Sequence, residues 1–540
     1  MTDLAAPRSV RDDVAPLDRL AAEHLATLGR TKAIQRLWQR DGTLFSDDPA
    51  VQKSVRDRLG WLFAVQAMRD EVERLAVLAR VVERHGYDRV LVIGMGGSSL
   101  WPEVIGRHLR GRRGLPIRVA DSTHPEAVAD VLEWCKAGKA LVVVATKSGG
   151  TVETISVYRT LRPLHDDGQH YVAITDPGSS LERLAKAEGF RDIFLNPADI
   201  GGRFSAGSLF GLVPAVLAGV VLVDALLRTE DMLEACRDED PRLNPGAQLG
   251  AFLAAAQQTG RWQLRLALGR DVRGFGGWVE QLIAESTGKR GTGLLPLLGG
   301  VDGEGEDLAH ALRHSVVVGL TTFANPDEDF LTRATSAGVP VQHQVMPETA
   351  DLWTEVVRWE VATAVCGVLL GINPFDEPDV TSAKQATNAL LDGSGQPVAA
   401  DKRIEVQALS EIPGILAEDL AGLAADDYLG VLCYLAPTPQ TLQRLESLRQ
   451  TLQARSAAAV TVQVGPRYLH STGQYHKGGM PRGRFVVVHD FARLGSQVPD
   501  VAIPGAKFGF AELVRAQCEG DIAVLHARGK PVTVVAVVPG

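Results

Sequence analysis

Residues 89–102 constrain the fold more than any other part of the chain. Residues 90–93 form an aliphatic run that is too short to span a membrane, which favours a buried strand of a parallel sheet. The glycine-rich residues 94–99 then let the backbone turn sharply toward a helix. Backbone N–H groups in such a turn, together with the positive end of the next helix dipole, attract an anion. We therefore expect an anion site at the end of this strand.

Length and charge limit what the rest of the protein can be. A chain of 540 residues exceeds the size at which one hydrophobic core keeps growing, so more than one domain is expected. The net charge of -9 offers no general attraction to nucleic acid or to an acidic membrane surface. Residues 204–223 carry no charge, but their serines, glycines and proline favour a buried helix over a membrane span.

Cysteine usage and the N-terminus bear on the compartment. The five cysteines are widely spaced and form no CxxC pair, which argues against a disulfide framework and a zinc ribbon. The residues after Met1 lack the apolar core of a signal peptide. We therefore expect a cytoplasmic protein.

The order of apolar patterns indicates an α/β organisation in four parts. Helical spacing dominates up to about residue 86, with a break at Asp41 and a long pattern over 51–85. Short aliphatic runs then alternate with amphipathic segments, as in a doubly wound parallel sheet. The strands expected from these runs are 90–93, 117–120, 141–145, 171–175 and 193–195 in the first α/β region and 315–320 and 342–346 in the second. A second α/β region follows a helix-rich stretch, and the turn-forming residues 392–397 mark a linker. The predicted units are a helical cap at 1–86, α/β domains at 87–230 and 231–395, and a C-terminal α/β unit at 396–540.

Two glycine-containing loops follow strands of the first predicted sheet. The loop at 94–99 spaces Gly94 and Gly96 like a dinucleotide fingerprint, and Asp121 ends the next strand, although Ser99 replaces the third glycine. A nicotinamide-dependent oxidoreductase is therefore an open alternative. The second loop combines hydroxyl groups and a lysine with glycines, which suits a phosphate monoester. It lacks the Gly-Lys-Ser/Thr ending of loops that bind nucleoside triphosphates. The candidate phosphate ligands in this loop are Thr146, Lys147, Ser148 and Thr151.

Four further polar groups could carry chemistry. Arg203 lies between two glycines and a long uncharged segment, where it is either a structural ion pair or a charge stabiliser. Glu285 follows an apolar run that could raise its pKa into the range of a general base, unless it is a surface carboxylate. Lys384 follows the rigid turn at 373–378, and residues 468–479 contain His470 and His476. Without an HExxH motif or a cysteine set, these histidines favour proton transfer over metal binding.

Together these motifs resemble the glucose-6-phosphate isomerase family. The resemblance runs from about residue 90 to residue 384, and its motifs lie at 94–98, 146–154, 201–205, 285–289 and 373–376, followed by Lys384. It implies two doubly wound parallel-sheet domains of the sugar isomerase type, with the active site between them. By this likeness Gly97 and Ser98 form a wall of the sugar-phosphate site. The phosphate would be held by Ser98, Thr146, Ser148 and Thr151, and the reacting carbons would be lined by Arg203, Gln281, Glu285 and Lys384.

The sequence departs from the family pattern at two places. Gly149 and Gly150 stand where the family usually has an aromatic residue and a threonine, which removes one hydroxyl group. The family's histidine motif normally lies between the glutamate and lysine motifs, whereas here its match, with His470, follows Lys384. This order is similar to the isomerase half of transaldolase/glucose-6-phosphate isomerase fusion enzymes. The chain shows no transaldolase-sized barrel region, so an isomerase alone is expected, with transaldolase as a possible associate.

The resulting hypothesis is an aldose–ketose isomerase that interconverts glucose 6-phosphate and fructose 6-phosphate. Glu285 is the candidate base that moves a proton between C2 and C1, and Arg203 stabilises the enediolate. His470 and Lys384 open the ring, and neither a metal nor an organic cofactor is required. A non-catalytic sugar-phosphate sensor is a second alternative. The family resemblance implies a dimer in which the neighbouring subunit supplies the histidine, whereas the transposed His470 suggests action within its own chain, as a monomer or homodimer.

Overall fold

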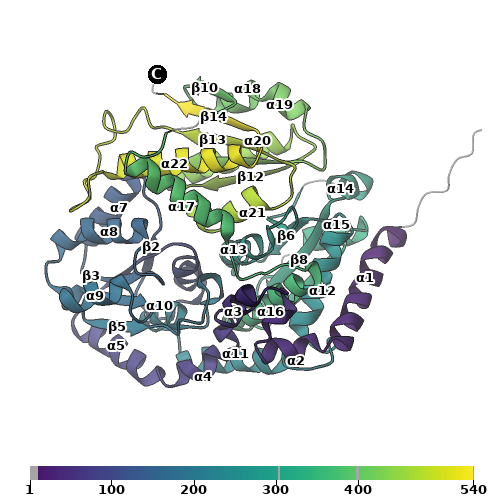
Figure 1. The fold of residues 1–540 in the computed structure, drawn as a ribbon, viewed down its shortest axis with the longest axis horizontal. Coiled ribbons are helices and arrows are strands. Elements are labelled where there is room, and N and C mark those ends of the chain that lie inside the picture. Colours follow the sequence, from purple (N-terminus) through teal and green to yellow (C-terminus); the bar gives the residue numbers. More distant parts are fainter. Residues whose placement is uncertain (1–9, 302–303, 327, 397–399, 539–540) are drawn as a thin grey trace, which may run out of the picture.

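The computed structural model describes residues 10–301, 304–326, 328–396 and 400–538. The segment after Met1, in which no signal peptide is expected, and Pro397 of the predicted linker lie outside the described residues. Three parallel sheets with helices on their faces form the molecule (Figure 1). The predicted α/β class is confirmed. Within the described ranges, no helix is long and apolar enough to cross a bilayer.

The N-terminal residues are helical, as predicted, but the pattern over 51–85 is several short helices and not one long helix. Gly60 explains the interruption, because its N–H donates to the Asp199 carbonyl at 2.8 Å and a Cβ there would lie 2.3 Å from Asp199 Oδ1. A continuous helix with a larger side chain could not make this approach. The helices are α1 (Val10–Arg30), α2 (Ala33–Trp38), α3 (Pro49–Arg56), α4 (Ala64–Arg69) and α5 (Val72–Arg84).

The first sheet has five parallel strands in the order β2-β1-β3-β4-β5, and all five were predicted. Its central strands are aliphatic and buried on both faces, as expected for a sheet covered by helices on each side. The strands are β1 (Arg89–Ile93), β2 (Ile117–Ala120), β3 (Ala140–Ala145), β4 (Tyr171–Thr175) and β5 (Asp192–Leu195). The helices that connect them are α6 (Leu100–Val104), α7 (Pro125–Lys136), α8 (Val152–Leu161) and α9 (Ser180–Ala187).

The uncharged segment at 204–223 is not one buried helix. It contains buried α10 (Leu209–Leu217), a turn at Gly219 with a φ of 74°, and the beginning of α11 (Leu222–Ala235). A left-handed glycine ends a helix at little cost, which breaks the apolar stretch into two elements. Next comes α12 (Pro245–Gln258), which packs against both α1 and a long helix of the second sheet region, α16 (Leu352–Leu370).

The second sheet has four parallel strands in the order β7-β6-β8-β9. Strands β8 and β9 were predicted, whereas β6 and β7 were not. Strand β6 carries a buried arginine, Arg265, and β7 has only four residues including Pro296, so neither shows the long aliphatic run used to find the others. The elements are β6 (Gln263–Leu268), α13 (Phe275–Thr287), β7 (Leu295–Leu298), α14 (Gly305–Ala311), β8 (Ser315–Thr322), α15 (Asp329–Ser336) and β9 (Val341–Met346).

The C-terminal unit is a third parallel sheet of five strands in the order β10-β14-β13-β11-β12. Its helix α22 (Phe510–Ala527) packs against α17 (Pro378–Leu391), and the two run side by side above the first sheet in Figure 1. The strands are β10 (Lys402–Val406), β11 (Tyr428–Tyr434), β12 (Ala459–Val464), β13 (Gly483–His489) and β14 (Val532–Val537), and the other helices are α18 (Ile412–Ile415), α19 (Ala417–Ala421), α20 (Pro439–Gln453) and α21 (Gly473–Gly478).

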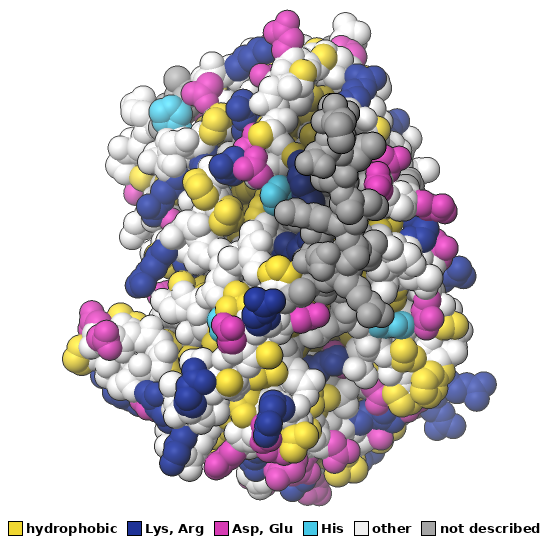
Figure 2. All heavy atoms as spheres, turned by 90° about the vertical axis from the view of Figure 1, so that its right-hand side faces the viewer, with side chains coloured by type: hydrophobic (Ala, Val, Ile, Leu, Met, Phe, Trp, Pro, Cys, Tyr) yellow, Lys and Arg dark blue, Asp and Glu magenta, His cyan; other side chains and the backbone are white. Residues whose placement is uncertain are grey.

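Charged side chains of both signs are mixed over the face shown in Figure 2, with hydrophobic side chains scattered between them. That face therefore carries no extended field of one sign of the kind that attracts nucleic acid. The division into four units remains a prediction.

Candidate active site

A cavity of about 180 Å³ lies where the second loop meets α17 and the C-terminal unit. It opens at the N-terminus of α8, where Thr151 is the N-cap residue, so backbone N–H groups and the helix dipole favour an anion. Lys384 of α17 and His470 lie across from this loop. Four predicted site residues are thus brought together around one space, namely Ser148, Thr151, Lys384 and His470.

The other predicted residues of the two loops do not line this cavity. Thr146 is buried, and its hydroxyl is 2.8 Å from that of Thr151, so it positions a cavity residue. The Lys147 ammonium pairs with Asp176 and donates to the Ala198 carbonyl at 2.8 Å. These two contacts hold the Lys147 side chain, so the protein itself already engages its ammonium group.

The first loop is covered by another segment of the chain. A Cβ on Gly97 would lie 1.8 Å from the Gly202 carbonyl oxygen, and Ser98 next to it is only partly exposed. Asp121, the candidate ribose ligand, lies 3.1 Å from the Arg467 guanidinium, and burial raises its pKa. These contacts do not favour a dinucleotide lying across the loop.

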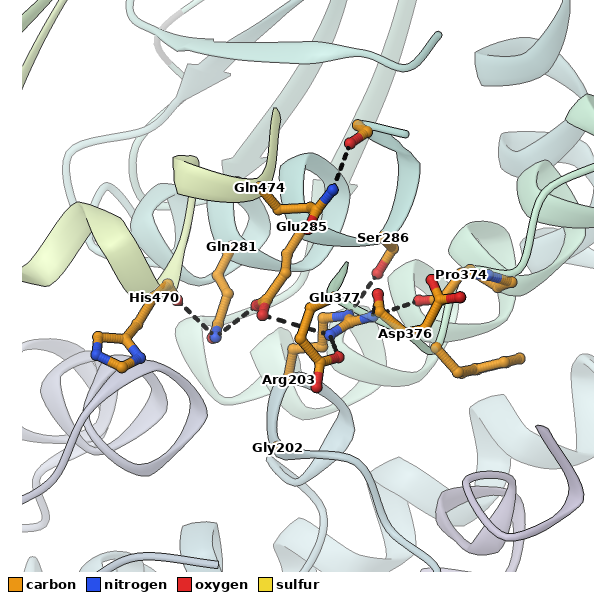
Figure 3. Close-up of polar contacts among 12 residues, drawn as sticks. Gly202, Arg203, Gln281, Glu285, Ser286, Pro374, Asp376, Glu377, His470 and Gln474 are labelled. Carbon is orange, nitrogen blue, oxygen red and sulfur yellow. Dashed lines mark hydrogen bonds and ion pairs between the residues drawn. The ribbon is translucent and has the colours of Figure 1, made fainter. Parts of the chain in front are cut away.

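Arg203 is held from several sides at the end of the Gly201–Gly202 turn (Figure 3). Its Nε donates to the Ser286 hydroxyl at 2.8 Å, and Nη2 donates to the carbonyls of Pro374 and Asp376 at 2.6 and 3.0 Å. Nη1 lies between two carboxylates, 3.0 Å from Glu377 and 3.5 Å from Glu285. The guanidinium is therefore fixed in orientation, with its charge directed at Glu285.

Glu285 is a buried carboxylate of α13 and not a surface residue, with 6% of its surface exposed. Burial is the main reason that its pKa is raised; the positive charge of Arg203 opposes the rise and the negative charge of Glu377 adds to it. The Gln281 amide donates to Glu285 Oε2 at 3.0 Å and to the His470 carbonyl at 2.9 Å (Figure 3). Gln281 thus links the base candidate to the segment that lines the cavity, while its own buried Oε1 has no hydrogen-bond partner among the described residues.

His470 ends a short 3-10 turn, Arg467–His470, and its ring reaches the first sheet region of the same chain. Its Nε2 is 3.1 Å from Glu153 Oε1, which also accepts a hydrogen bond from Gln517 Nε2 at 2.8 Å. Burial pushes the pKa of Glu153 upward, but the hydrogen bond and charge of His470 outweigh it, so the net pKa is lowered. Gln517 in turn accepts from the Thr123 hydroxyl at 2.6 Å.

Three residues of this network were not assigned from the sequence. Glu153 and Glu377 lie in segments that the sequence analysis singled out. Their carboxylates could therefore have been proposed as partners of the predicted histidine and arginine. Gln517 had none, because it lies on α22, which the strand and helix patterns did not reveal. His476 is not part of the site: it is buried between Tyr428 and Gln463, which lie 3.2 and 2.8 Å from its ring nitrogens.

One group of metal-ligand type occurs elsewhere, at the junction of α7 and the end of β13. Ligand atoms of His124, Glu126 and Asp490 lie within 4.8 Å of one another. Arg493 already pairs with Asp490 at 2.9 Å and with Glu126 at 3.2 Å, so a guanidinium supplies the positive charge there.

Comparisons with known proteins bear on the arrangement just described. The family model described as phosphoglucose isomerase matches residues 64–291, which include both loops, Arg203 and Glu285. Over that part of its length the chain is similar to phosphoglucose isomerases. It is 28% identical to the glucose-6-phosphate isomerase of Parasynechococcus marenigrum over 74% of this chain and 79% of that protein. It is 27% identical to the probable glucose-6-phosphate isomerase of Methanococcus maripaludis over 57% of this chain and 80% of that protein.

Solved structures agree with this similarity at the level of the fold. A hypothetical protein from Thermus thermophilus aligns with a TM-score of 0.58 and 21% identity, covering 70% of this chain and 98% of that one. A glucose-6-phosphate isomerase from Chlamydia trachomatis aligns with a TM-score of 0.50 and 20% identity, over 72% and 81% of the two chains. The predicted resemblance to phosphoglucose isomerases is confirmed, whereas the likeness to transaldolase fusions stays a prediction.

Proposed function

We propose that this protein interconverts glucose 6-phosphate and fructose 6-phosphate through a cis-enediolate, with Glu285 as the base. The observation that carries the proposal is the buried Glu285 carboxylate, linked through Gln281 to the cavity segment and faced by the fixed guanidinium of Arg203. Burial raises the pKa of Glu285, which makes its carboxylate a stronger base for taking a proton from carbon.

The phosphate end of the substrate is assigned to the second loop. Ser148, Thr151 and the N-terminus of α8 present hydroxyl and backbone donors to the cavity, and Lys384 adds a positive charge from the opposite side. Binding the remote phosphate places the reacting carbons near Glu285, which converts binding energy into orientation. The free Oε1 of Gln281 is suited to accept a hydrogen bond from a sugar hydroxyl.

The proton steps balance within the chain's own residues. His470, oriented by Glu153, exchanges a proton with the ring oxygen and Lys384 assists as the ring opens. Glu285 then removes the proton from C2, and Arg203 stabilises the negative charge that develops on the enediolate oxygens. Protonated Glu285 returns the proton to C1 while the hydroxyl proton passes from O2 to O1 of the cis-enediolate, which completes the aldose-to-ketose conversion without an external oxidant.

The first experiment is a coupled assay with fructose 6-phosphate on the wild-type protein and on Glu285→Gln. The amide keeps the shape of the side chain but cannot take a proton, so kcat should fall about 10³-fold or more while a sugar-acid phosphate inhibitor still binds. Turnover in the variant close to that of the wild type would refute the base assignment. A wild-type protein that binds fructose 6-phosphate without turnover would instead identify a sensor.

We further propose that His470 acts in its own chain, because its ring contacts Glu153 of that chain. Mixing inactive Glu285→Gln and His470→Ala proteins under conditions of subunit exchange tests this. The mixture should stay inactive, because each active site then lacks one group. Recovery to about one quarter of wild-type activity would show that the histidine is delivered by a neighbouring subunit.

The remaining predictions about partners and location belong here as well. The candidate active site supports a sugar phosphate as the substrate. Association with transaldolase and the choice between monomer and homodimer remain predictions. The cysteines at 135, 236, 366, 433 and 518 are free and buried in the structure, which supports a reducing compartment such as the cytoplasm.

A further inference from the structure

A second cavity, of about 470 Å³, lies on the other side of the turn that holds Arg203. Its walls are the loop after α13, the turn between α16 and α17, and two loops of the C-terminal unit, so three parts of the molecule meet there. It shares no described lining residue with the cavity at Ser148 and His470. It is therefore a separate space that the isomerase reaction does not use.

Five cationic side chains and two carboxylates, Asp376 and Asp379, line this second cavity. Three of its cationic side chains have carboxylate partners: Lys289 lies 2.7 Å from Asp376, Lys477 lies 2.5 Å from Asp521, and Arg528 pairs with Asp379. The two others are Arg290 and Lys530. Among the described residues, no carboxylate lies within 4.0 Å of either of these two cations. The cavity thus holds two positive charges that the protein does not compensate.

The environment of Lys530 is the main indication that this cavity binds a ligand. It is only 6% exposed, and its ammonium donates one hydrogen bond, to the Met480 carbonyl at 3.1 Å. Burial lowers its pKa, and no neighbouring acid offsets that effect. A buried ammonium with unused donors is costly unless an anion meets it.

Arg290 is presented at the rim of the same cavity by an unusual backbone. Its φ is 54°, in the left-handed region that non-glycine residues rarely adopt. The following residue fastens the loop to the C-terminal unit, because the Gly291 N–H donates to the Gly478 carbonyl at 2.9 Å. Strained conformations of this kind persist where the surroundings impose them, and they cluster at ligand clamps.

We propose that this cavity binds a small soluble dianion of the phosphate or phosphate-ester class, held between the Lys530 ammonium and the Arg290 guanidinium. Two uncompensated cations match two negative charges, and the planar guanidinium can meet two phosphate oxygens at once. The volume is in the range of ordinary small-molecule sites. The ligand would also lie against Lys289 and Asp376, in the turn whose carbonyls bind Arg203.

Equilibrium dialysis with radiolabelled inorganic phosphate tests this proposal by counting sites. The wild-type protein should bind two phosphates, one in each cavity. Lys530→Gln and Arg290→Gln should each weaken one site at least tenfold, while Ser148→Ala weakens the other and leaves the Lys530 site intact. Lys530→Arg, which keeps the charge, should retain both sites, as should Lys507→Gln, an exposed lysine elsewhere.

Glutamine can still donate to the Met480 carbonyl, so Lys530→Gln should fold normally, which its thermal unfolding will verify. Unchanged stoichiometry in both the Lys530→Gln and Arg290→Gln proteins would overturn the proposal. So would a wild-type stoichiometry of one at about 10 mM phosphate, with that site abolished by Ser148→Ala. The measurement reads binding directly, so its result does not depend on whether the chain is an active isomerase.

Discussion

Two glycine loops leave neighbouring strands of the first sheet, yet they end in opposite environments. After β1, a Cβ on Gly97 would lie 1.8 Å from the Gly202 carbonyl oxygen, so this loop is covered by the segment that carries Arg203. After β3, the nearest atom to a Cβ on Gly150 is Ser180 Oγ at 3.9 Å, and the loop lines a cavity. A similar strand, glycine and helix pattern therefore makes a packing surface in one case and a ligand surface in the other.

The difference comes from distant parts of the chain and not from the loops themselves. Gly96 has a φ of 55°, and a Cβ there would lie 2.6 Å from the Gln281 amide nitrogen. The closed loop thus supports the residues that orient Glu285, while the open loop is available to the phosphate. Glycine at position 97 allows close approach to another segment. In the second loop Gly149 is needed for its left-handed backbone, with a φ of 77°, and Gly150 leaves room at the cavity.

The largest expected effect comes from Gly97→Ala, with Gly150→Ala as its matched control. The new methyl group at position 97 must displace the Gly202 backbone and with it Arg203, so we expect a loss of about 3 kcal/mol in unfolding free energy and at least 100-fold in kcat. The same methyl group at position 150 meets open space. Urea unfolding and the coupled assay measure both variants. Equal effects of the two substitutions would refute the distinction between a packed first loop and an open second loop.

An intermediate effect is expected for Ser148→Ala in the open loop. Losing one hydrogen bond to a charged phosphate should lower kcat/KM about 10- to 100-fold, mainly through KM. The unfolding free energy should stay within about 0.5 kcal/mol of the wild-type value, because the side chain is exposed. A large loss of unfolding free energy with an unchanged KM would show that Ser148 serves packing, as the first loop does, and not phosphate binding.

The smallest effect is a change in pH dependence for Glu377→Gln on the closed side. Burial keeps the pKa of Glu285 raised and the Glu377 charge adds to the rise, so removing that charge should lower the pKa. The base is active when ionised, and the acid limb of kcat/KM should therefore move to lower pH. A pH profile measured with fructose 6-phosphate checks this, and an acid limb that stays in place or moves upward would refute the coupling.

Much of the fold could be predicted from local patterns. The strands of the first sheet are aliphatic runs in a regular rhythm, and α16 and α17 end at clear turn formers. The strands that were missed lack that rhythm: β10 is an edge strand rich in charged residues, and β6 includes Arg265, whose Nε donates to the Ser315 hydroxyl at 3.2 Å inside the core.

The site was predictable in its members but not in its contacts. Family motifs led to Arg203 and Glu285, but the sequence left Glu285 open as a surface carboxylate, and only the structure shows that both side chains are buried. That Gly97 packs on Gly202, or that Lys147 pairs with Asp176, depends on how separate segments meet in space. No spacing within one segment carries that information, which is why the two loops looked equivalent in the sequence.

The bond between the Gln281 amide and the His470 carbonyl joins residues that are 189 positions apart in the chain but 2.9 Å apart in space. Because these contacts are made in space and not along the chain, the histidine segment could change its place in the gene while its position in the fold stayed the same. A search that expects motifs in a fixed order would then report the histidine as missing from an enzyme that has it.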